Sequence, residues 1–224
     1  MYDYIIVGAG SAGCVLAHRL SQDPATRVLL LEAGGTDRKR EFHIPAAFPF
    51  LLNTECDWAY ETEPQAALGE RKLFWPRGKV LGGTSAINGM IYIRGHPQDY
   101  DDWQDAGNAG WGYQGVLPYF KKAQHQERGA SDYHGVGGPL RVADLRTVNP
   151  LTIRFLRAAA EVGIAPNADF NGSSQEGVGL HQVNQKRGRR HSAAAAYLRP
   201  ALGRNNLTVC THAQATRILF QDKR

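Results

Sequence analysis

The sequence is poor in cysteine and has no long apolar run. Cys14, Cys56 and Cys210 lie far apart among the 224 residues and form no CxxC pair. We therefore expect neither a disulfide framework nor a metal site, and a reducing compartment fits best. The longest weakly apolar run, residues 5–17, contains glycines and is too short for a membrane span, and no basic signal-peptide start precedes it. The prediction is a cytoplasmic protein, with peripheral attachment at the inner membrane left open.

Charge of one sign does not dominate the chain. Lysine and arginine number 26 against 21 acidic residues, a net charge of +5, and the two signs are interleaved. A nucleic-acid partner is therefore not expected. One short basic run, KRGRR at residues 186–190, is compatible with acidic lipid or an anionic substrate, but a solvated loop is the favoured interpretation. The eight histidines show no metal-ligand spacing and no orienting motif, so we assign none of them a catalytic role.

The first thirty residues have the pattern of a βαβ unit. Tyr4–Val7 is a short apolar run that ends in glycines, which is typical of a fully buried parallel strand. Apolar residues at helical spacing follow in residues 13–20, and Asp23-Pro24 ends that pattern. A second apolar run, Val28–Leu31, predicts the second strand.

The middle of the chain is less regular. Residues 34–76 are rich in proline and aromatic residues and predict loops without a long helix, with the tryptophans of the chain as packing residues. Residues 99–104 are compatible with a helix start, and the polar residues 126–138 predict a surface loop.

The last third contains a clear helix signal. Asn149-Pro150 predicts an N-cap followed by proline at the first helical position, and Gly163 predicts the end of the helix. One face of this helix is apolar, with Leu151, Phe155, Ala159 and Val162. Further predictions are a strand with alternating residues 178–182, a helix capped by Ser192, and two strands, Leu207–Cys210 and Ala215–Phe220.

A glycine motif occupies the junction of the predicted first strand and helix. Residues 8–13 read GAGSAG, a GxGxxG motif, and Glu32 follows the second strand. Gly8 permits a tight turn, Gly10 lets the backbone approach a pyrophosphate, and Gly13 lets helix and strand pack closely. Glu32 is placed to accept hydrogen bonds from ribose hydroxyls. The hexapeptide alone fits a structural turn equally well, but its setting favours dinucleotide binding without separating NAD from FAD.

A second glycine motif lies in residues 75–95, WPRGKVLGGTSAINGMIYIRG. Paired glycines followed by Thr84 and Ser85 give a compact run of backbone and hydroxyl donors, suited to a phosphate or a flavin edge. This run resembles the first signature of the glucose-methanol-choline (GMC) oxidoreductase family, and together with the opening MYDYIIVGAGSAG it is most similar to the choline and alkanol dehydrogenases of that family. The resemblance covers essentially the whole chain and argues against an NAD-only dehydrogenase.

The resemblance implies an α/β fold: a Rossmann-like FAD-binding domain with a parallel sheet, plus the start of an α+β substrate domain. It divides the chain into residues 1–145 of the FAD-binding domain, residues 146–190 of the substrate domain, and residues 191–224, which return to the FAD-binding domain. The C-terminal remainder of the family is expected to be absent.

The resemblance also implies a set of FAD-binding residues. The first motif and Glu32 would hold the ADP half, the second motif would lie along the pyrophosphate, ribityl chain and isoalloxazine, and Ala215 would contact the adenine. The residues are Gly8, Gly10, Ser11, Ala12, Gly13, Glu32, Ala33, Val80, Gly82, Gly83, Thr84, Asn88, Gly89, Met90, Ile91 and Ala215. Ile87 replaces the histidine that some relatives bond to the flavin, so FAD is expected to be noncovalent.

The implied reaction is hydride transfer from an alcohol carbon to flavin N5, with a quinone or another carrier as electron acceptor. The catalytic pair of the family, a histidine with a second histidine or an asparagine, belongs to the C-terminal part. We therefore assign no catalytic residue and expect this fragment alone to be inactive. The alternatives are an alcohol oxidase that uses oxygen, a hydroxynitrile lyase of the same fold, and a catalytically inactive flavin-binding fragment. Two glycine motifs in the correct order carry the FAD prediction, whereas alcohol oxidation rests on the resemblance.

Overall fold

The computed structural model describes residues 1–220 and divides the chain into two compact units. Unit 1 combines residues 1–89 with the chain from Arg189 onward, and unit 2 comprises Met90–Gly188. The predicted boundaries at residues 145 and 190 separate an FAD-binding domain from a substrate domain, whereas the two units are distinguished only as separately compact parts of the chain. The predicted boundaries therefore stay a prediction.

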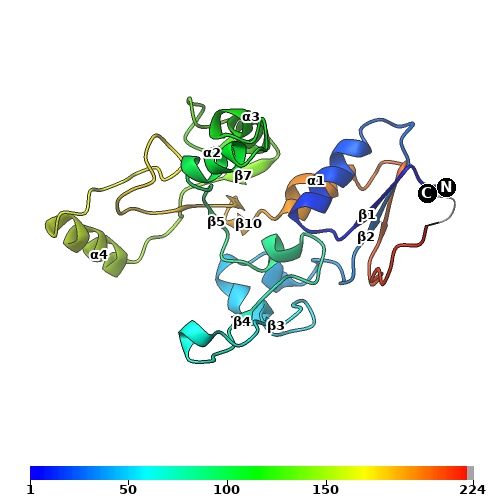
Figure 1. The fold of residues 1–224 in the computed structure, drawn as a ribbon, viewed down its shortest axis with the longest axis horizontal. Helices are drawn as coiled ribbons and strands as arrows, with labels where there is room; N and C mark the ends of the chain where they lie inside the picture. The colour runs from blue at the N-terminus through cyan, green and yellow to red at the C-terminus, as the bar shows by residue number, and fades with distance from the viewer. Residues whose placement is uncertain (221–224) are drawn as a thin grey trace. The chain divides into compact units, whose positions relative to one another are not determined.

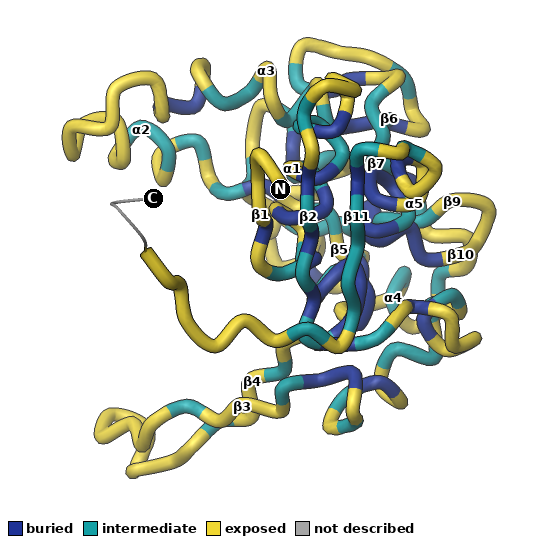
Figure 2. The backbone as a smooth tube through the Cα atoms, turned by 90° about the vertical axis from the view of Figure 1, so that its right-hand side faces the viewer, coloured by how far each residue is buried: buried dark blue, intermediate teal, exposed yellow. Residues whose placement is uncertain are grey.

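Unit 1 is built on a parallel sheet of three strands. The strands are β1 (Tyr4–Val7), β2 (Val28–Leu31) and β11 (Leu207–Cys210), and β2 lies between the other two (Figure 2). Helix α1 (Ser11–Leu20) connects β1 to β2 and packs on both (Figure 1). The structure confirms the predicted βαβ unit and the α/β class with a parallel sheet.

Burial differs between the two strands of the βαβ unit. Val28 and Leu30 of β2 are fully buried, as expected for a central strand. In β1 only Ile6 is buried, whereas Ile5 is 61% and Val7 63% exposed. The prediction of a fully buried first strand is therefore wrong. β1 is an edge strand, and residues 5 and 7 point away from the side of the strand that carries Ile6.

The rest of unit 1 consists of short elements, some of which share an apolar cluster. As predicted, residues 34–76 form no long helix. The cluster joins Phe42 and Leu51 of this region to Val80 and Ile87 of the second glycine motif. The short elements are the 3₁₀-helices η1 (Arg40–Phe42), η2 (Pro45–Leu51), η3 (Ala66–Leu68) and η4 (Gly83–Ala86), the strands β3 (Tyr60–Glu61), β4 (Phe74–Trp75) and β10 (Arg189–Arg190), the π-helix η5 (Ala194–Leu198) and α5 (Arg199–Ala201).

The C-terminal predictions have mixed outcomes. Ser192 caps the alanine-rich helix, because its Oγ accepts a hydrogen bond from the Ala195 amide at 3.2 Å. Strand β11 is confirmed, but the strand predicted at 215–220 does not form in the described residues. Ile218, Leu219 and Phe220 are 77%, 72% and 75% exposed. An apolar run becomes a strand only where another strand pairs with it, and residues 215–220 have no such neighbour in the described part of the chain.

Unit 2 contains three helices and two small sheets. Strand β5 (Ile91–Tyr92) pairs antiparallel with β8 (Gln182–Val183), and β6 (Gln124–Gln126) pairs in parallel with β7 (Leu140–Val142). The remaining elements are α2 (Pro97–Asp105), α3 (Tyr113–Ala123), α4 (Pro150–Glu161) and β9 (Gln185–Lys186). Helix α2 contains the predicted residues 99–104. The surface loop predicted at 126–138 forms at 127–138, but Gln126 belongs to β6 and is buried, and His134 within the loop is buried as well.

One prediction in unit 2 is wrong and another is confirmed. The alternating strand at 178–182 is wrong except at its last residue, since Val178 forms only an isolated bridge with Pro166. Helix α4 has its predicted cap, with Asn149 Oδ1 accepting from the Leu151 amide at 2.9 Å, and Gly163 follows with φ +91°. Its apolar face is exposed apart from Ala159, however, with Leu151 67%, Phe155 67% and Val162 77% exposed.

Candidate functional site

A cavity of about 270 Å³ lies at the carboxyl edge of the unit 1 sheet. The residues that line it come from the ends of β1 and β2, from the second glycine motif, from the segment after β11 and, with Trp58, from the loop before β3. Ligands of open α/β sheets bind at this edge because the connecting loops leave a crevice there. Six predicted site residues line the cavity: Gly8, Gly10, Glu32, Ala33, Gly83 and Ala215.

The first glycine motif has the geometry that its sequence predicts. Gly8 has φ +90°, a conformation that favours glycine, and a side chain on Gly10 would meet no protein atom within 4 Å. A Cβ on Gly13 would collide with the carbonyl oxygen of Gly8, so this glycine serves the packing of helix on strand. No side chain caps α1, and its N-terminal amides are therefore left for another partner.

Glu32 is the charged group of the cavity and is only 5% exposed. Its Oε2 accepts from the Ala9 amide at 2.7 Å, and its Oε1 accepts from the Gly34 amide at 2.9 Å. A carboxylate has about four acceptor positions, so both oxygens keep capacity for hydroxyl donors. Glu32 thus fixes the turn of the first motif and still offers acceptors to a ligand.

The second glycine motif lies directly against the first. The Gly82 amide donates to the carbonyl of Ala9 at 2.7 Å, and a Cβ on Gly83 would lie 2.7 Å from Gly10 Cα. Gly82 and Gly83 have φ values of +95° and +53°. Glycine is therefore needed here both for backbone conformation and for close approach. The structure thus brings together two motifs that are seventy residues apart in the sequence.

The hydroxyl groups of the second motif have protein partners. Thr84 Oγ1 accepts from the Gly78 amide at 3.1 Å. Ser85 Oγ donates to the Gly82 carbonyl at 2.5 Å and accepts from the Ala193 amide at 2.9 Å. These hydroxyls fold the turn, and what faces the cavity is the backbone of Gly78 and Gly83.

The other predicted residues do not line this cavity. Ser11, Ala12 and Gly13 belong to α1, Val80 is 1% exposed, and Gly82 and Thr84 lie in the turn around η4. Asn88 and Gly89 end the first segment of unit 1, whereas Met90 and Ile91 begin unit 2. Met90 has φ +63°, which is uncommon for a residue with a side chain, and its carbonyl accepts from the Asn184 amide at 2.8 Å.

Sequence reasoning missed six residues of the cavity: Val7, Leu31, Trp58, Gly78, Ala213 and Gln214. Trp58, interpreted as a packing residue, lines the cavity while it stacks on Tyr60 with 5.7 Å between ring centroids. The Ala213 amide donates to the Glu32 carbonyl at 2.8 Å, which holds the segment after β11 beside the first motif. The position of Ala213 just after a parallel strand was a signal that could have found it.

The cysteines of unit 1 include no reactive pair. Cys14 is fully buried in α1, and burial raises the pKa of its thiol to about 12. Its Sγ donates to the Ala9 carbonyl at 3.2 Å, so Cys14 is a packing residue behind the first motif. Among residues 1–220, no cluster of metal-ligating side chains occurs, and no helix is both long and apolar enough to cross a membrane.

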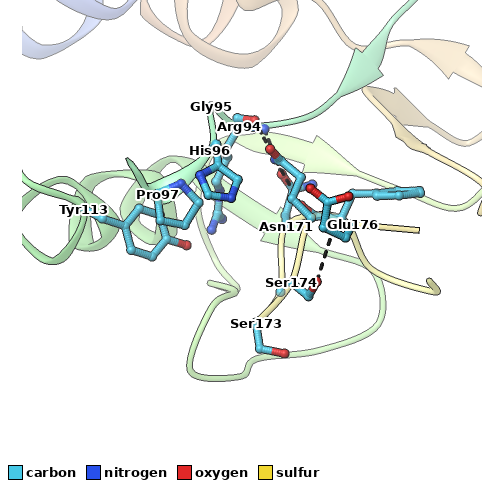
Figure 3. Close-up of a pocket in the computed structure, with 12 residues that line it drawn as sticks. Arg94, Gly95, His96, Pro97, Tyr113, Asn171, Ser173, Ser174 and Glu176 are labelled. Carbon is cyan, nitrogen blue, oxygen red and sulfur yellow. Dashed lines mark hydrogen bonds between the residues drawn. The ribbon is translucent and has the colours of Figure 1, made fainter. Parts of the chain in front are cut away.

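Unit 2 has a smaller polar cavity of about 200 Å³. Figure 3 shows His96 and Tyr113 on one side of it and Asn171, Ser174 and Glu176 on the other. Asn171 Oδ1 accepts from the Arg94 amide at 2.8 Å, and its Nδ2 donates to the Tyr92 carbonyl at 3.1 Å. Asn171 therefore clamps the chain that follows β5. None of the predicted site residues lines this cavity.

Comparison with known proteins agrees with this geometry. A family model described as GMC oxidoreductase matches residues 2–224. The chain belongs to the GMC oxidoreductase family. The resemblance predicted from the two glycine motifs is thereby confirmed.

Individual members of the GMC family align over the whole chain. An alcohol dehydrogenase [acceptor] from Pseudomonas putida is 53% identical over 226 residues, and human mitochondrial choline dehydrogenase is 50% identical over 234 residues. The crystal structure of pyridoxine 4-oxidase from Mesorbium loti superposes with a TM-score of 0.94 at 40% identity over 99% of this chain. The chain covers 41%, 39% and 44% of these three proteins, so it spans well under half of their length.

Proposed function

We propose that unit 1 binds FAD noncovalently in the service of alcohol oxidation. The observation that carries the proposal is the meeting of the two glycine motifs at the carboxyl edge of the sheet, around a cavity that also contains Glu32. Ligand sites commonly measure about 300 to 1,000 Å³, so a cavity of about 270 Å³ suits part of a dinucleotide rather than all of it. The rest of the cofactor would extend along the second motif.

The residues present fit the two ends of an ADP group. The uncapped N-terminus of α1 offers amides and a positive dipole end to the pyrophosphate, and the open space at Gly10 lets the phosphate approach the backbone. The free acceptor positions of Glu32 suit ribose hydroxyls. The segment at Ala213–Ala215, which lines the cavity, is proposed to contact the adenine.

The second motif is proposed to hold the remainder of FAD. Residues 80–84 would follow the pyrophosphate and ribityl chain, and residues 88–91 would face the isoalloxazine. Ile87 is 1% exposed and is an aliphatic residue, which supports noncovalent attachment at this position. We keep the division of the chain into residues 1–145, 146–190 and 191–224 as part of this proposal.

The proposed reaction is oxidation of a small-molecule alcohol. Bound FAD supplies the acceptor for a hydride from the alcohol carbon. The residues of this chain bind and orient the cofactor, and no described side chain is assigned the removal of the hydroxyl proton. Electrons are proposed to pass to a quinone or another carrier, in agreement with the acceptor-dependent name of the Pseudomonas putida relative. Where that carrier is a membrane quinone, we propose peripheral association with the membrane surface.

Oxygen is the alternative acceptor, because the similar pyridoxine 4-oxidase is named an oxidase. Anaerobic reduction of the flavin by a panel of alcohols, followed by mixing with either oxygen or a soluble quinone, separates the two. The dehydrogenase proposal expects fast reoxidation by the quinone and slow formation of peroxide. Rapid stoichiometric peroxide release would contradict it.

The cofactor proposal is tested by absorption spectroscopy of the full-length protein before and after acid precipitation. We expect a flavin spectrum in the native protein and release of FAD into the supernatant. Flavin that stays in the precipitate would contradict noncovalent binding. Failure to bind added FAD would contradict the cofactor proposal as a whole.

A further inference from the structure

The basic run at residues 186–190 contains one arginine that is not on the surface. Arg189 is exposed, as expected for a solvated loop, but its neighbour Arg190 is only 5% exposed. Burial of a guanidinium is costly unless it is paired and hydrogen-bonded. A solvated loop, as predicted for this run, therefore does not account for the buried guanidinium of Arg190.

The hydrogen-bond partners of the Arg190 side chain are neutral oxygens of unit 1. Nε donates to the Phe42 carbonyl at 3.1 Å, and Nη1 donates to the Ser85 carbonyl at 3.2 Å and to Asn88 Oδ1 at 3.0 Å. No ion pair involves Arg190 within residues 1–220, and its buried Nη2 has no hydrogen-bond partner there. A positive charge thus lies inside unit 1 with no carboxylate of residues 1–220 within 4 Å to balance it.

The charge persists under ordinary conditions. Burial lowers the pKa of Arg190 to about 10, which still leaves the guanidinium protonated at neutral pH. Carbonyl and amide dipoles solvate it in part, but they do not cancel its field. The Nη2 donor of Arg190 is unpaired and the guanidinium charge is unbalanced. An anionic ligand nearby would stabilise this buried side chain on both counts.

Arg190 also fixes the second glycine motif. It holds the backbone of Ser85 and the side chain of Asn88, while the Ser85 hydroxyl is bound to the Ala193 amide at 2.9 Å. The segment from 190 to 193 is therefore tied at several points to the turn that ends at Asn88. Removal of Arg190 would take away the donor that Asn88 Oδ1 accepts from at 3.0 Å.

We propose that Arg190 is a positioning residue for the flavin: it orients Asn88 and the preceding turn, and its unbalanced charge favours the negatively charged reduced cofactor. The inference rests on the proposed binding of FAD along this motif. Charge close to a flavin is one of the means by which a protein tunes the redox behaviour of the cofactor. Arg190 acts through Asn88 and through its field.

The first test is a double-mutant cycle on FAD affinity in the full-length protein, with Arg190→Met, Asn88→Ala and the two combined. We expect each single variant to weaken FAD binding about tenfold and the double variant to bind about as weakly as the weaker single one. Independent, additive losses would overturn the positioning role. If Arg190→Met does not fold, Arg190→Lys takes its place in the same cycle.

The second test is the flavin midpoint potential. Arg190→Met should lower the potential, because the reduced anionic flavin loses a positive neighbour, whereas Arg190→Lys should stay close to wild type. Arg189→Met removes an exposed charge one residue away and is the matched control, with no expected change. A potential in Arg190→Met equal to that of wild type would overturn the charge role.

The two proposals fail in distinguishable ways. If wild-type protein does not bind FAD, the proposed function fails. If wild type binds FAD but the cycle is additive and the potential does not change, only the role of Arg190 fails.

Discussion

The two glycine motifs of unit 1 are shaped by different parts of the chain. The first lies between β1 and α1, and its turn is set mainly by the elements directly before and after it, with Ala9 also bound to Glu32 and Gly82. The second is held by distant residues, with hydrogen bonds to Ala9, Gly35 and Ala193. A motif of the first kind can be interpreted from local sequence, whereas one of the second kind takes its shape from tertiary contacts.

The largest loss of folding stability is expected from Gly13→Ala in the first motif. Its Cβ would collide with the Gly8 carbonyl oxygen, so α1 and β1 must separate, at a cost of about 3 kcal/mol. Urea unfolding of the cofactor-free protein measures this loss in the free energy of unfolding. Gly10→Ala is the matched variant: its Cβ meets no protein atom within 4 Å, so it should cost about 1 kcal/mol or less.

The same two variants distinguish a role in folding from a role in ligand binding. Gly10→Ala should weaken FAD binding roughly tenfold or more, because the backbone at that position is proposed to lie against the pyrophosphate. An unchanged FAD affinity in Gly10→Ala would contradict the proposed site, and an unchanged stability in Gly13→Ala would contradict the packing role.

The next effect concerns the contact between β2 and the first motif. Glu32→Ala leaves the buried amides of Ala9 and Gly34 without their acceptor and should destabilise unit 1 by about 2 kcal/mol. Glu32→Gln keeps one acceptor oxygen and should cost roughly half as much. The exposed Glu63→Ala is the control. If Glu32→Ala were as mild as Glu63→Ala in thermal unfolding, the hydrogen bonds of Glu32 would not hold the turn.

A smaller effect tests the tertiary origin of the second motif. Ser85→Ala removes the acceptor of the buried Ala193 amide and the donor to Gly82, so the free energy of unfolding should fall by about 1 kcal/mol. Ser11→Ala, on exposed α1 surface, should be close to neutral. Hydrogen exchange should show faster exchange at Ala193 in Ser85→Ala alone. Equal protection in both variants would argue against the contact.

The smallest expected effect is on the pH dependence of folding stability, through His18 in α1, the helix that follows the first motif. Burial, followed by the charges of Arg204 and Arg19, lowers the pKa of His18 below its unfolded value of about 6.5. The unfolded chain then takes up a proton first as the pH falls, so stability is retained above about 6.5 and declines below it. His18→Gln should flatten this decline below about pH 6.5. A steeper decline in the variant would contradict the sign.

The local patterns allowed the βαβ unit, the cap at Asn149 and the cap at Ser192 to be predicted, because each depends on residues within a few positions. The strand predicted at 215–220 and most of that at 178–182 were wrong, because a strand needs a partner that the local pattern does not name. The exposure of β1 was missed for a similar reason. Apolar composition does not say whether a strand lies in the middle or at the edge of a sheet.

By itself, the sequence determined which residues turn, which start helices and which glycines lie between a strand and a helix, since these properties follow from backbone sterics and neighbouring hydrogen bonds. Only the tertiary structure decided that Gly82 and Gly83 lie against Ala9 and Gly10. It alone placed Arg190 in the interior, although the run KRGRR is typical of a solvated loop. Such contacts join residues about seventy or more positions apart, and their energies depend on burial and mutual geometry that no local pattern contains.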